Sequence, residues 1–79
     1  MLKEIVKRNW DFILFEDGNE KIITVVFFDK AIDYTRSFYL TEEEFSLDVS
    51  VLANLSVSIR NNYESFKDRE ILPSITSEN

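Results

Sequence analysis

The segment from Ile22 to Phe28 constrains the fold of this chain more than any other feature. It reads Ile-Ile-Thr-Val-Val-Phe-Phe, and β-branched and aromatic residues of this kind favour a β-strand. Because successive side chains of a strand point to opposite faces of a sheet, this strand is apolar on both faces. Such a strand belongs inside a sheet, with a covering layer on each side.

The flanking sequence supplies partner strands. Residues 10–15 read as a strand, and the segment from Glu16 to Glu20 contains the Asp-Gly pair that marks a tight hairpin. Asp29 to Ile32 reads as a second turn, and residues 34–40 alternate as a third strand does. The sequence therefore predicts a three-stranded antiparallel meander.

A helix start follows the third strand. Thr41 can cap the free amides of a helix and Glu44 can bond back to it, while Leu40 and Phe45 fit the positions of a hydrophobic staple. Beyond this start, apolar residues recur every three or four positions and predict a long C-terminal helix whose apolar stripe lies on the sheet. The residues of the stripe are Phe45, Val49, Leu52, Leu55, Ile59, Tyr63 and Phe66.

The helical pattern is weakest from Ser46 to Ser58, where Ser and Val are frequent and the residues partly alternate as in a strand. A break near residues 46–48, with Asp48 as a second cap, would reconcile the two patterns. The predicted fold is thus α+β: a three-stranded antiparallel β-meander packed by a long C-terminal helix, either whole or broken.

The two ends of the chain carry weaker signals. The apolar residues at positions 2–6 fall at helical spacing and favour a short helical turn, although an extended lead-in to the first strand fits as well. Ile71 and Leu72 can fold back against the domain. We therefore expect a single domain over residues 1–73 and a flexible polar tail over residues 74–79.

The charge of the chain is acidic and unevenly placed. The net charge is −6; residues 9–59 hold ten acids against three bases, while the two ends together hold five acids and six bases. An acidic middle repels nucleic acid and anionic membrane and attracts basic partners, although solubility alone would also explain it. Cysteine is absent, no apolar run is long enough for a membrane span, and the charged start differs from a signal peptide, so we expect a cytoplasmic protein.

The residue types of common active sites are missing. There is no His and no Cys, which removes the usual general base and the thiol nucleophile, and Gly18 is the only glycine, which removes a glycine-rich phosphate loop. We therefore predict neither an enzyme nor a cofactor. A metal held between Asp29, Asp33 and residues 42–44 is the remaining catalytic alternative, but turn and capping roles already explain these acids.

RNA binding is a further, minor alternative. If the two ends of the chain meet, their basic residues would gather beside Trp10, although the overall sign of the charge opposes this use. These residues are Lys3, Lys7, Arg8, Arg60, Lys67 and Arg69.

The second face of the central strand needs a cover that one helix cannot provide. The first strand adds to the excess, since Trp10, Phe12 and Leu14 point one way while Ile13 and Phe15 point the other. Either the two chain ends fold over this face, or a second copy or a partner protein covers it. The free edges of a three-stranded meander would suit such an association.

The second half of the chain resembles a known group of proteins. It reads Phe-Tyr-Leu-Thr-Glu-Glu-Glu at residues 38–44, then Leu52 and Leu55, then Ile-Arg-Asn at residues 59–61 and Arg-Glu-Ile at residues 69–71. Over residues 40–71 this pattern resembles small bacterial proteins found among the immunity genes of toxin systems. The Ser- and Val-rich stretch departs from the charged helix of that group, and no site residue is carried over. The resemblance implies a protein that inhibits a toxin by stoichiometric binding.

Together these features predict an acidic protein-binding module, with an immunity-type inhibitor of a basic toxin or nuclease as its leading form. A homo-oligomeric structural or adaptor domain, for example a homodimer, is the alternative. Turn acids and helix-start glutamates would meet basic side chains of the partner protein, with tyrosines as aromatic anchors. The predicted partner-binding residues are Glu16, Asp17, Glu20, Asp29, Asp33, Tyr34, Tyr39, Glu42 and Glu43.

Overall fold

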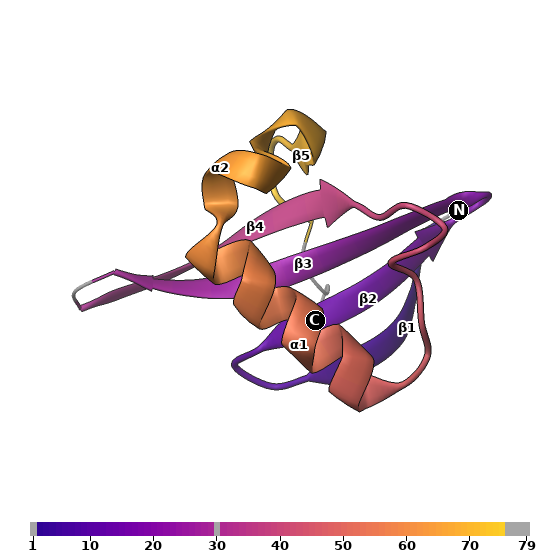
Figure 1. The fold of residues 1–79 in the computed structure, drawn as a ribbon, viewed down its shortest axis with the longest axis horizontal. Helices are drawn as coiled ribbons and strands as arrows, with labels where there is room; N and C mark the ends of the chain where they lie inside the picture. Colours follow the sequence, from indigo (N-terminus) through magenta and orange to yellow (C-terminus); the bar gives the residue numbers. More distant parts are fainter. Residues whose placement is uncertain (1, 30, 76–79) are drawn as a thin grey trace.

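The computed structural model describes residues 2–29 and 31–75. Within these residues five antiparallel strands form one sheet in the order β1-β2-β3-β4-β5, so that the strands lie side by side in the order of the sequence (Figure 1). The strands are β1 (Leu2–Arg8), β2 (Phe12–Asp17), β3 (Glu20–Asp29), β4 (Ile32–Tyr39) and β5 (Glu70–Ile71).

Between β4 and β5 the chain forms a main helix and a short helical return. α1 (Val49–Asn61) is followed by α2 (Tyr63–Phe66) and by the 3-10 turn η1 (Lys67–Arg69). The prediction of a three-stranded meander with a long C-terminal helix is therefore wrong. The described sheet has one more strand at each edge, and the helical residues are divided among shorter elements.

The first edge strand, β1, corrects the expectation of a helical turn near residues 2–6. Ile5 and Val6 are β-branched, which suits a strand, and β1 pairs with backbone groups of β2 that would otherwise form a free edge. A β-bulge between Glu4 and Val6 interrupts the register, and both Ile5 and Val6 pack against the core. Pairing with β2 thus overrides the helical spacing of the sequence.

The divided helix follows its capping signals. Asp48 caps α1 as predicted, because its carboxylate accepts hydrogen bonds from the amide and the hydroxyl of Ser50 at 2.9 and 2.7 Å. These bonds lower the pKa of the Asp48 carboxyl. Thr41 and Glu44 also exchange the two hydrogen bonds of a capping box, at 2.9 and 3.2 Å, but this box closes only a single turn. The first helix of more than one turn, α1, therefore begins after Asp48 and not after Thr41.

The return from α1 to the sheet explains β5. α2 places the rings of Tyr63 and Phe66 edge-on against Phe38 of β4, with ring centroids 6.2 and 6.4 Å apart. η1 then brings the chain beside β4, where Ser37 pairs with Ile71. The bend after α1 is what allows these rings to pack on β4.

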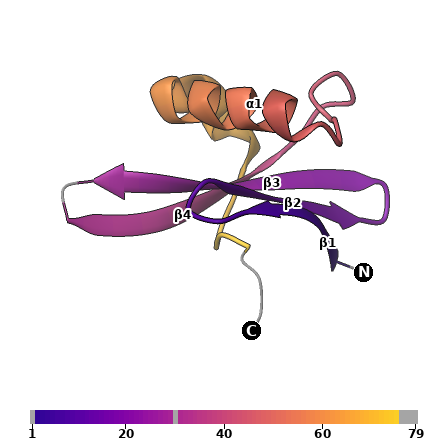
Figure 2. The ribbon, with the colours of Figure 1, turned by 90° about the horizontal axis from the view of Figure 1, so that it is seen from below.

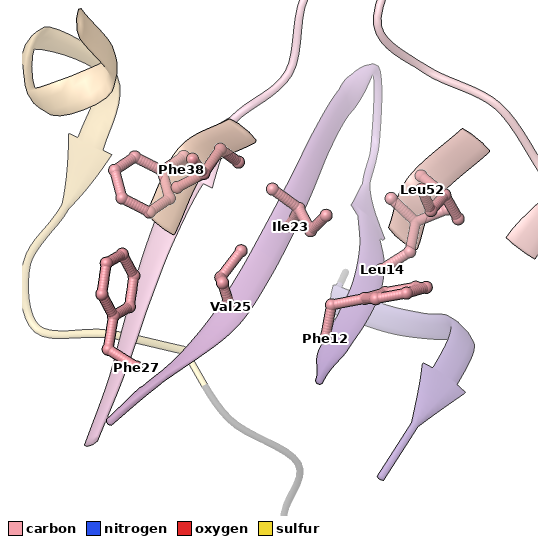
Figure 3. Close-up of a cluster of buried hydrophobic side chains, with 8 residues drawn as sticks. Phe12, Leu14, Ile23, Val25, Phe27, Phe38 and Leu52 are labelled. Carbon is pink, nitrogen blue, oxygen red and sulfur yellow. The ribbon is translucent and has the colours of Figure 1, made fainter. Parts of the chain in front are cut away.

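The face of the sheet under α1, here called the front face, carries the hydrophobic core (Figure 3). Alternate residues of β2, β3 and β4 meet Leu52 and Ile59 of α1, which are fully buried. Both helix residues belong to the apolar stripe that the sequence predicts. The buried sheet residues of this core are Phe12, Leu14, Ile23, Val25, Phe27 and Phe38.

The opposite face, here called the back face, is crossed by the C-terminal strap, which we define as residues 72–75 (Figure 2). The amide of Ile75 donates to the Ser37 hydroxyl at 2.7 Å, and its carbonyl accepts from the Thr24 hydroxyl at 2.5 Å. Thr24 and Ser37 are both buried, and their hydroxyls lie 2.7 Å apart. The strap is thus bonded to the sheet through side-chain hydroxyls.

The burial of two back-face residues answers part of the question of what covers the second face. Phe15 and Ile22 alternate with core residues, so they lie on the back face, and both are buried within the chain itself. Phe28, at the far end of β3, remains 57% exposed. The back face therefore divides into a covered region and an open end.

The predicted flexible tail of residues 74–79 is only partly described. Ser74 and Ile75 belong to the strap, where Ser74 also bonds to β4. Residues 76–79 lie outside the described part of the chain, as does Lys30 in the predicted second turn. Among the described helices, none has the length and apolar character needed to cross a membrane.

Candidate functional site

Six of the nine predicted partner-binding residues lie at one end of the sheet, here called the acidic end. The β2–β3 hairpin and the connection that leaves β4 meet there, because antiparallel pairing places the start of β3 beside the end of β4. Asp17, Glu20, Glu42 and Glu43 are exposed at this end. The six residues are Glu16, Asp17, Glu20, Tyr39, Glu42 and Glu43.

Two local signals position these carboxylates. Gly18 adopts a φ of +62° in the β2–β3 turn, a conformation that glycine takes without strain, and so closes the hairpin tightly. The capping box of Thr41 and Glu44 turns the chain after β4 and leaves Glu42 and Glu43 exposed. Both signals can be recognised in the sequence.

The basic residues of the acidic end lie close to acids. Lys21 Nζ is 3.1 Å from Glu16, and Lys3 stands opposite Glu16 in the β1–β2 register. Arg69 donates to both carboxylate oxygens of Glu44, at 2.5 and 3.0 Å. The hydrogen bond from Arg69 lowers the pKa of the Glu44 carboxyl and raises the pKa of the Arg69 guanidinium. The exposed carboxylates therefore set the sign of the charge on this surface.

A cavity of about 470 Å³ opens at the acidic end. Leu40 and Phe45 contribute apolar surface, and Lys21 Nζ lies 5.2 Å from the centroid of the Phe45 ring. Glu42 also lines the cavity. The lining thus combines apolar surface with one carboxylate and one ammonium group, a mixture that suits an amphipathic side chain of a partner.

Tyr39 supplies an aromatic side chain beside the acidic surface. It follows Phe15 and Ile22 in a row across the back face and is 43% exposed. Its carbonyl accepts a hydrogen bond from Arg69 at 3.3 Å, which links it to the Glu44 ion pair. Half-exposed tyrosines in such positions often anchor protein interfaces.

The three remaining predicted residues lie at the opposite end of the sheet. Asp29, Asp33 and Tyr34 flank the β3–β4 hairpin, which points away from the β2–β3 hairpin. Tyr34 stacks on Phe27, with ring centroids 5.6 Å apart, so part of its ring is used within the fold. The nine predicted residues therefore form two groups and not a single surface.

The same topology separates the carboxylates of the metal alternative. Asp29 and Asp33 adjoin the β3–β4 hairpin, whereas residues 42–44 belong to the acidic end. Across residues 2–29 and 31–75, no group of three or more His, Cys, Asp or Glu side chains is placed to hold a metal ion. The positions of these carboxylates therefore give no support to a metal site shared by Asp29, Asp33 and residues 42–44.

A cluster of polar and aromatic residues on the front face ties β5 to the sheet. Arg36 and the Tyr63 hydroxyl both donate to the Glu70 carboxylate, at 2.8 and 2.5 Å. These bonds raise the pKa of the Arg36 guanidinium and of the Tyr63 hydroxyl. The Glu70 side chain is only 6% exposed, so this cluster fastens the chain and presents little reactive surface.

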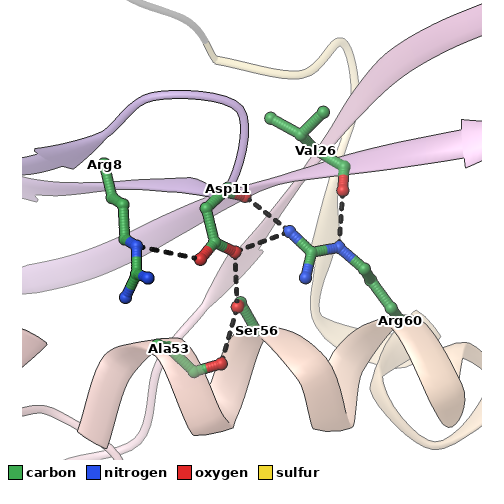
Figure 4. A network of polar contacts seen from close by, with 6 residues as sticks. All are labelled: Arg8, Asp11, Val26, Ala53, Ser56 and Arg60. Carbon is green, nitrogen blue, oxygen red and sulfur yellow. Dashed lines mark hydrogen bonds and ion pairs between the residues drawn. The ribbon is translucent and has the colours of Figure 1, made fainter. Parts of the chain in front are cut away.

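Another polar cluster, here called the Asp11 cluster, joins the β1–β2 turn to α1 (Figure 4). The Asp11 carboxylate accepts hydrogen bonds from Arg60 at 2.7 Å and from the Ser56 hydroxyl at 2.9 Å. Arg60 also donates to the backbone carbonyls of Asp11 and Val26, at 2.9 and 2.7 Å. Arg8 Nε lies 3.5 Å from the second carboxylate oxygen. The turn is thereby fixed to the helix.

The six basic residues that RNA binding would require do not form one cluster in the structure. Four of them form ion pairs with acids of the fold: Arg8, Arg60, Lys67 and Arg69. Only Lys7 and Arg8 stand beside Trp10, where all three line a second cavity. Sequence reasoning missed this cavity, because the letters Arg-Asn-Trp-Asp do not signal the turn that Trp10 adopts.

No known protein family, curated protein or solved structure matches this chain. The fold and the acidic end define a small α+β domain that exposes several carboxylates at one end of its sheet, beside a cavity that Glu42 lines.

Proposed function

We propose that this chain is a cytoplasmic protein-binding module that docks its acidic end on a basic surface of another protein. One observation carries the proposal. Glu20, Glu42 and Glu43 are exposed at the acidic end, where Glu42 lines a cavity, while Lys21 and Arg69 at the same end are paired with acids. The surface therefore presents negative charge to a partner.

The physical chemistry of this surface suits protein recognition. Clustered carboxylates raise the encounter rate with a basic partner, and their effect weakens as salt screens them. Affinity also needs a desolvated centre, which the cavity beside Phe45 and the half-exposed Tyr39 supply. Charge and apolar surface thus occur together at the acidic end.

Within this class we propose stoichiometric inhibition of a basic toxin, the function that the resemblance over residues 40–71 implies. The acidic connection of residues 42–44 lies inside the resembling segment and also at the acidic end. An inhibitor of this kind needs tight binding and no reactive group, which agrees with a chain that has no His and no Cys.

Binding to a different protein is better supported than pairing of sheet edges between two copies. The β1 edge carries a bulge and four charged residues, and β5 has only two residues. Charges and bulges are means by which edge strands avoid pairing with another copy. A net charge of −6 adds mutual repulsion.

Two triple variants test the proposal. The first removes three carboxylates of the acidic end: Glu20→Gln, Glu42→Gln and Glu43→Gln. The second removes three exposed carboxylates elsewhere: Asp33→Asn, Glu64→Gln and Asp68→Asn. Tagged wild type and both variants are used to capture partners from a lysate of the native host at low salt. The wild type and the second variant should retain one basic protein, while the first variant should bind it about tenfold more weakly.

Two outcomes would contradict the proposal. Equal loss of binding in both triple variants would mean that net charge alone drives the association. Recovery of no protein by the wild type at low salt would leave the acidic end without a partner. The inhibitor form is tested separately: the captured protein should lose its toxicity at a one-to-one ratio, and retained toxicity would overturn that form.

A further inference from the structure

A second cavity, of about 490 Å³, lies at the end of the molecule opposite the acidic end, where the β1–β2 turn meets the back face. Ile13 and Val26 line it with apolar surface, and Trp10 lines it while remaining 73% exposed. Small-molecule sites commonly have this volume and this mixture of apolar walls with a few polar groups. We call it the Trp10 cavity.

Trp10 is held in an unusual backbone conformation. Its φ is +66°, and among the described residues no other non-glycine residue has a positive φ. A bulky side chain is rarely found there, because Cβ crowds the backbone. Such conformations persist where the surroundings impose them, and they cluster at binding sites.

The Asp11 cluster imposes this conformation. The amide of Asp11 donates to the Arg8 carbonyl at 3.1 Å and closes the turn, while the Asp11 carbonyl accepts from the amide of Val26 at 2.9 Å. Arg60 and Ser56 hold the Asp11 side chain toward α1. The turn is therefore fixed before any ligand arrives, which reduces the entropy lost on binding.

The charge beside the Trp10 cavity is positive. Lys7 pairs with Ile13 across β1 and β2, and within residues 2–29 and 31–75 its ammonium has no ion-pair partner. Arg8 also lines the cavity, with its Nε 3.5 Å from Asp11. The acids near this region are Asp11, which is engaged by Arg60, and Asp33, which lies two residues before Thr35 on β4. Neither lines the cavity.

The C-terminal strap limits the size of the ligand. Thr35 lines the cavity and its hydroxyl lies 2.9 Å from that of Ser74 in the strap. The strap also bonds to Thr24 and Ser37, the pair of back-face residues beside Val26 and Thr35. An extended peptide or nucleic-acid strand laid across this face would collide with the strap, whereas a compact ligand would not.

We propose that the Trp10 cavity binds a small amphipathic anion. Its apolar body would lie against Trp10, Ile13 and Val26, and its carboxylate, sulfonate or phosphate would lie near Lys7. This site is independent of the acidic end and goes beyond the protein-binding function proposed above.

Because Trp10 is the only tryptophan, its fluorescence reports directly on the cavity. We would titrate the full chain with octanoate, with 1-octanol, which has the same apolar body without the charge, and with acetate, which has the charge without the body. Octanoate should change the emission saturably and bind roughly threefold to fivefold more tightly than octanol, as one exposed charge pair allows. Acetate should cause no change.

Matched variants assign the preference to Lys7. Lys7→Gln should abolish the preference for octanoate over octanol, whereas Lys3→Gln, which removes the same charge from the other end of β1, should preserve it. Trp10→Gly, followed by calorimetry, should lose most octanoate binding while the circular dichroism spectrum of the fold is retained. The triple variant of the acidic end should bind octanoate as the wild type does.

Several results would overturn the proposal. Equal affinity for octanoate and octanol, or equal effects of Lys7→Gln and Lys3→Gln, would remove the anion site. An emission change that never saturates would indicate unspecific partitioning. Tighter, Lys7-dependent binding of an acidic peptide or of single-stranded DNA would assign the cavity to a macromolecular ligand in place of a small anion.

Discussion

The two faces of the sheet are closed by different chemistry. The front face is closed by apolar side chains that meet Leu52 and Ile59 of α1, and the back face is crossed by a strap held through the hydroxyls of Thr24 and Ser37. Apolar contacts are non-directional and add up with buried area. A hydrogen bond contributes only about 1 kcal/mol net, because the strand and the strap would otherwise bond to water.

Because of this difference, the two faces contribute differently to stability and to surface chemistry. The front face holds the larger cluster of buried side chains, so truncating one of them leaves a cavity in the core. The back face buries Phe15 and Ile22, holds the strap through a few hydrogen bonds, and ends in an open cavity beside Trp10. Surface chemistry can therefore vary on the back face at a smaller cost to the fold.

The largest expected effect is on the front face. Phe38→Ala removes a fully buried ring that contacts Tyr63 and Phe66, and it should lower the free energy of unfolding by about 3–5 kcal/mol. Urea denaturation followed by circular dichroism measures this change. Phe28→Ala, at the open end of the back face, is the control and should cost well under half as much. Similar losses would mean that both faces carry the core.

A smaller effect is expected where the strap is bonded. Ser37→Ala removes the hydroxyl that accepts from the amide of Ile75 and bonds to Thr24, so the half-buried Ile75 amide loses its acceptor and the buried Thr24 hydroxyl loses one of its two partners. The free energy of unfolding should fall by about 1–2 kcal/mol. Ser58→Ala, on the exposed side of α1, should change it little. A loss as large as that of Phe38→Ala would abolish the distinction between the faces.

A pH-dependent effect is expected at the acidic end, where Glu44 pairs with Arg69. Glu44→Gln removes the ion pair with Arg69 and should destabilise the fold by about 1 kcal/mol near neutral pH. Because the folded state lowers the pKa of Glu44 from its ordinary 4.5, this stabilisation is complete above that pH. It is lost as the pH falls through the lowered value, so wild type and variant should converge in acid. Glu43→Gln, an exposed neighbour, is the control for the charge change; a pH-independent difference would argue against the ion pair.

The smallest expected effect is an increase, and not a decrease, in the free energy of unfolding. Trp10→Gly relieves the positive φ on the back-face side of the β1–β2 turn and should raise the free energy of unfolding by about 0.5–1 kcal/mol, after allowing for the greater freedom of glycine in the unfolded chain. Thermal and urea unfolding would measure it. Destabilisation would show that the indole contributes more to packing than its exposure indicates, and the back face would then resemble the front.

Local signals explain which parts of the fold could be predicted. The Asp17-Gly18 turn closes the β2–β3 hairpin and Asp48 caps α1, because both features depend on residues close in the sequence. β1 and β5 could not be predicted in the same way. β1 has a helical spacing that only the edge of β2 overrides, and the two residues of β5 are strand only because η1 returns them to β4.

In the candidate site, too, features set by residues close in the sequence could be predicted and long-range features could not. The carboxylates of the acidic end were visible as turn and capping residues, but their division from Asp29 and Asp33 depends on how the hairpins alternate between the two ends of the sheet. The Trp10 cavity needed still more long-range information. It depends on Arg60 reaching Asp11 across almost fifty residues of sequence, and no local pattern contains that contact.

The bulge in β1 also bears on whether folded molecules can polymerise edge to edge. A growing fibril requires a strand whose register repeats without interruption from one molecule to the next. The shift between Glu4 and Val6 breaks that repeat at the long exposed edge of the sheet, and the charges on either side discourage a slipped pairing. A domain with so many β-branched and aromatic residues thus carries its own barrier against templated polymerisation at the edge where a template would form.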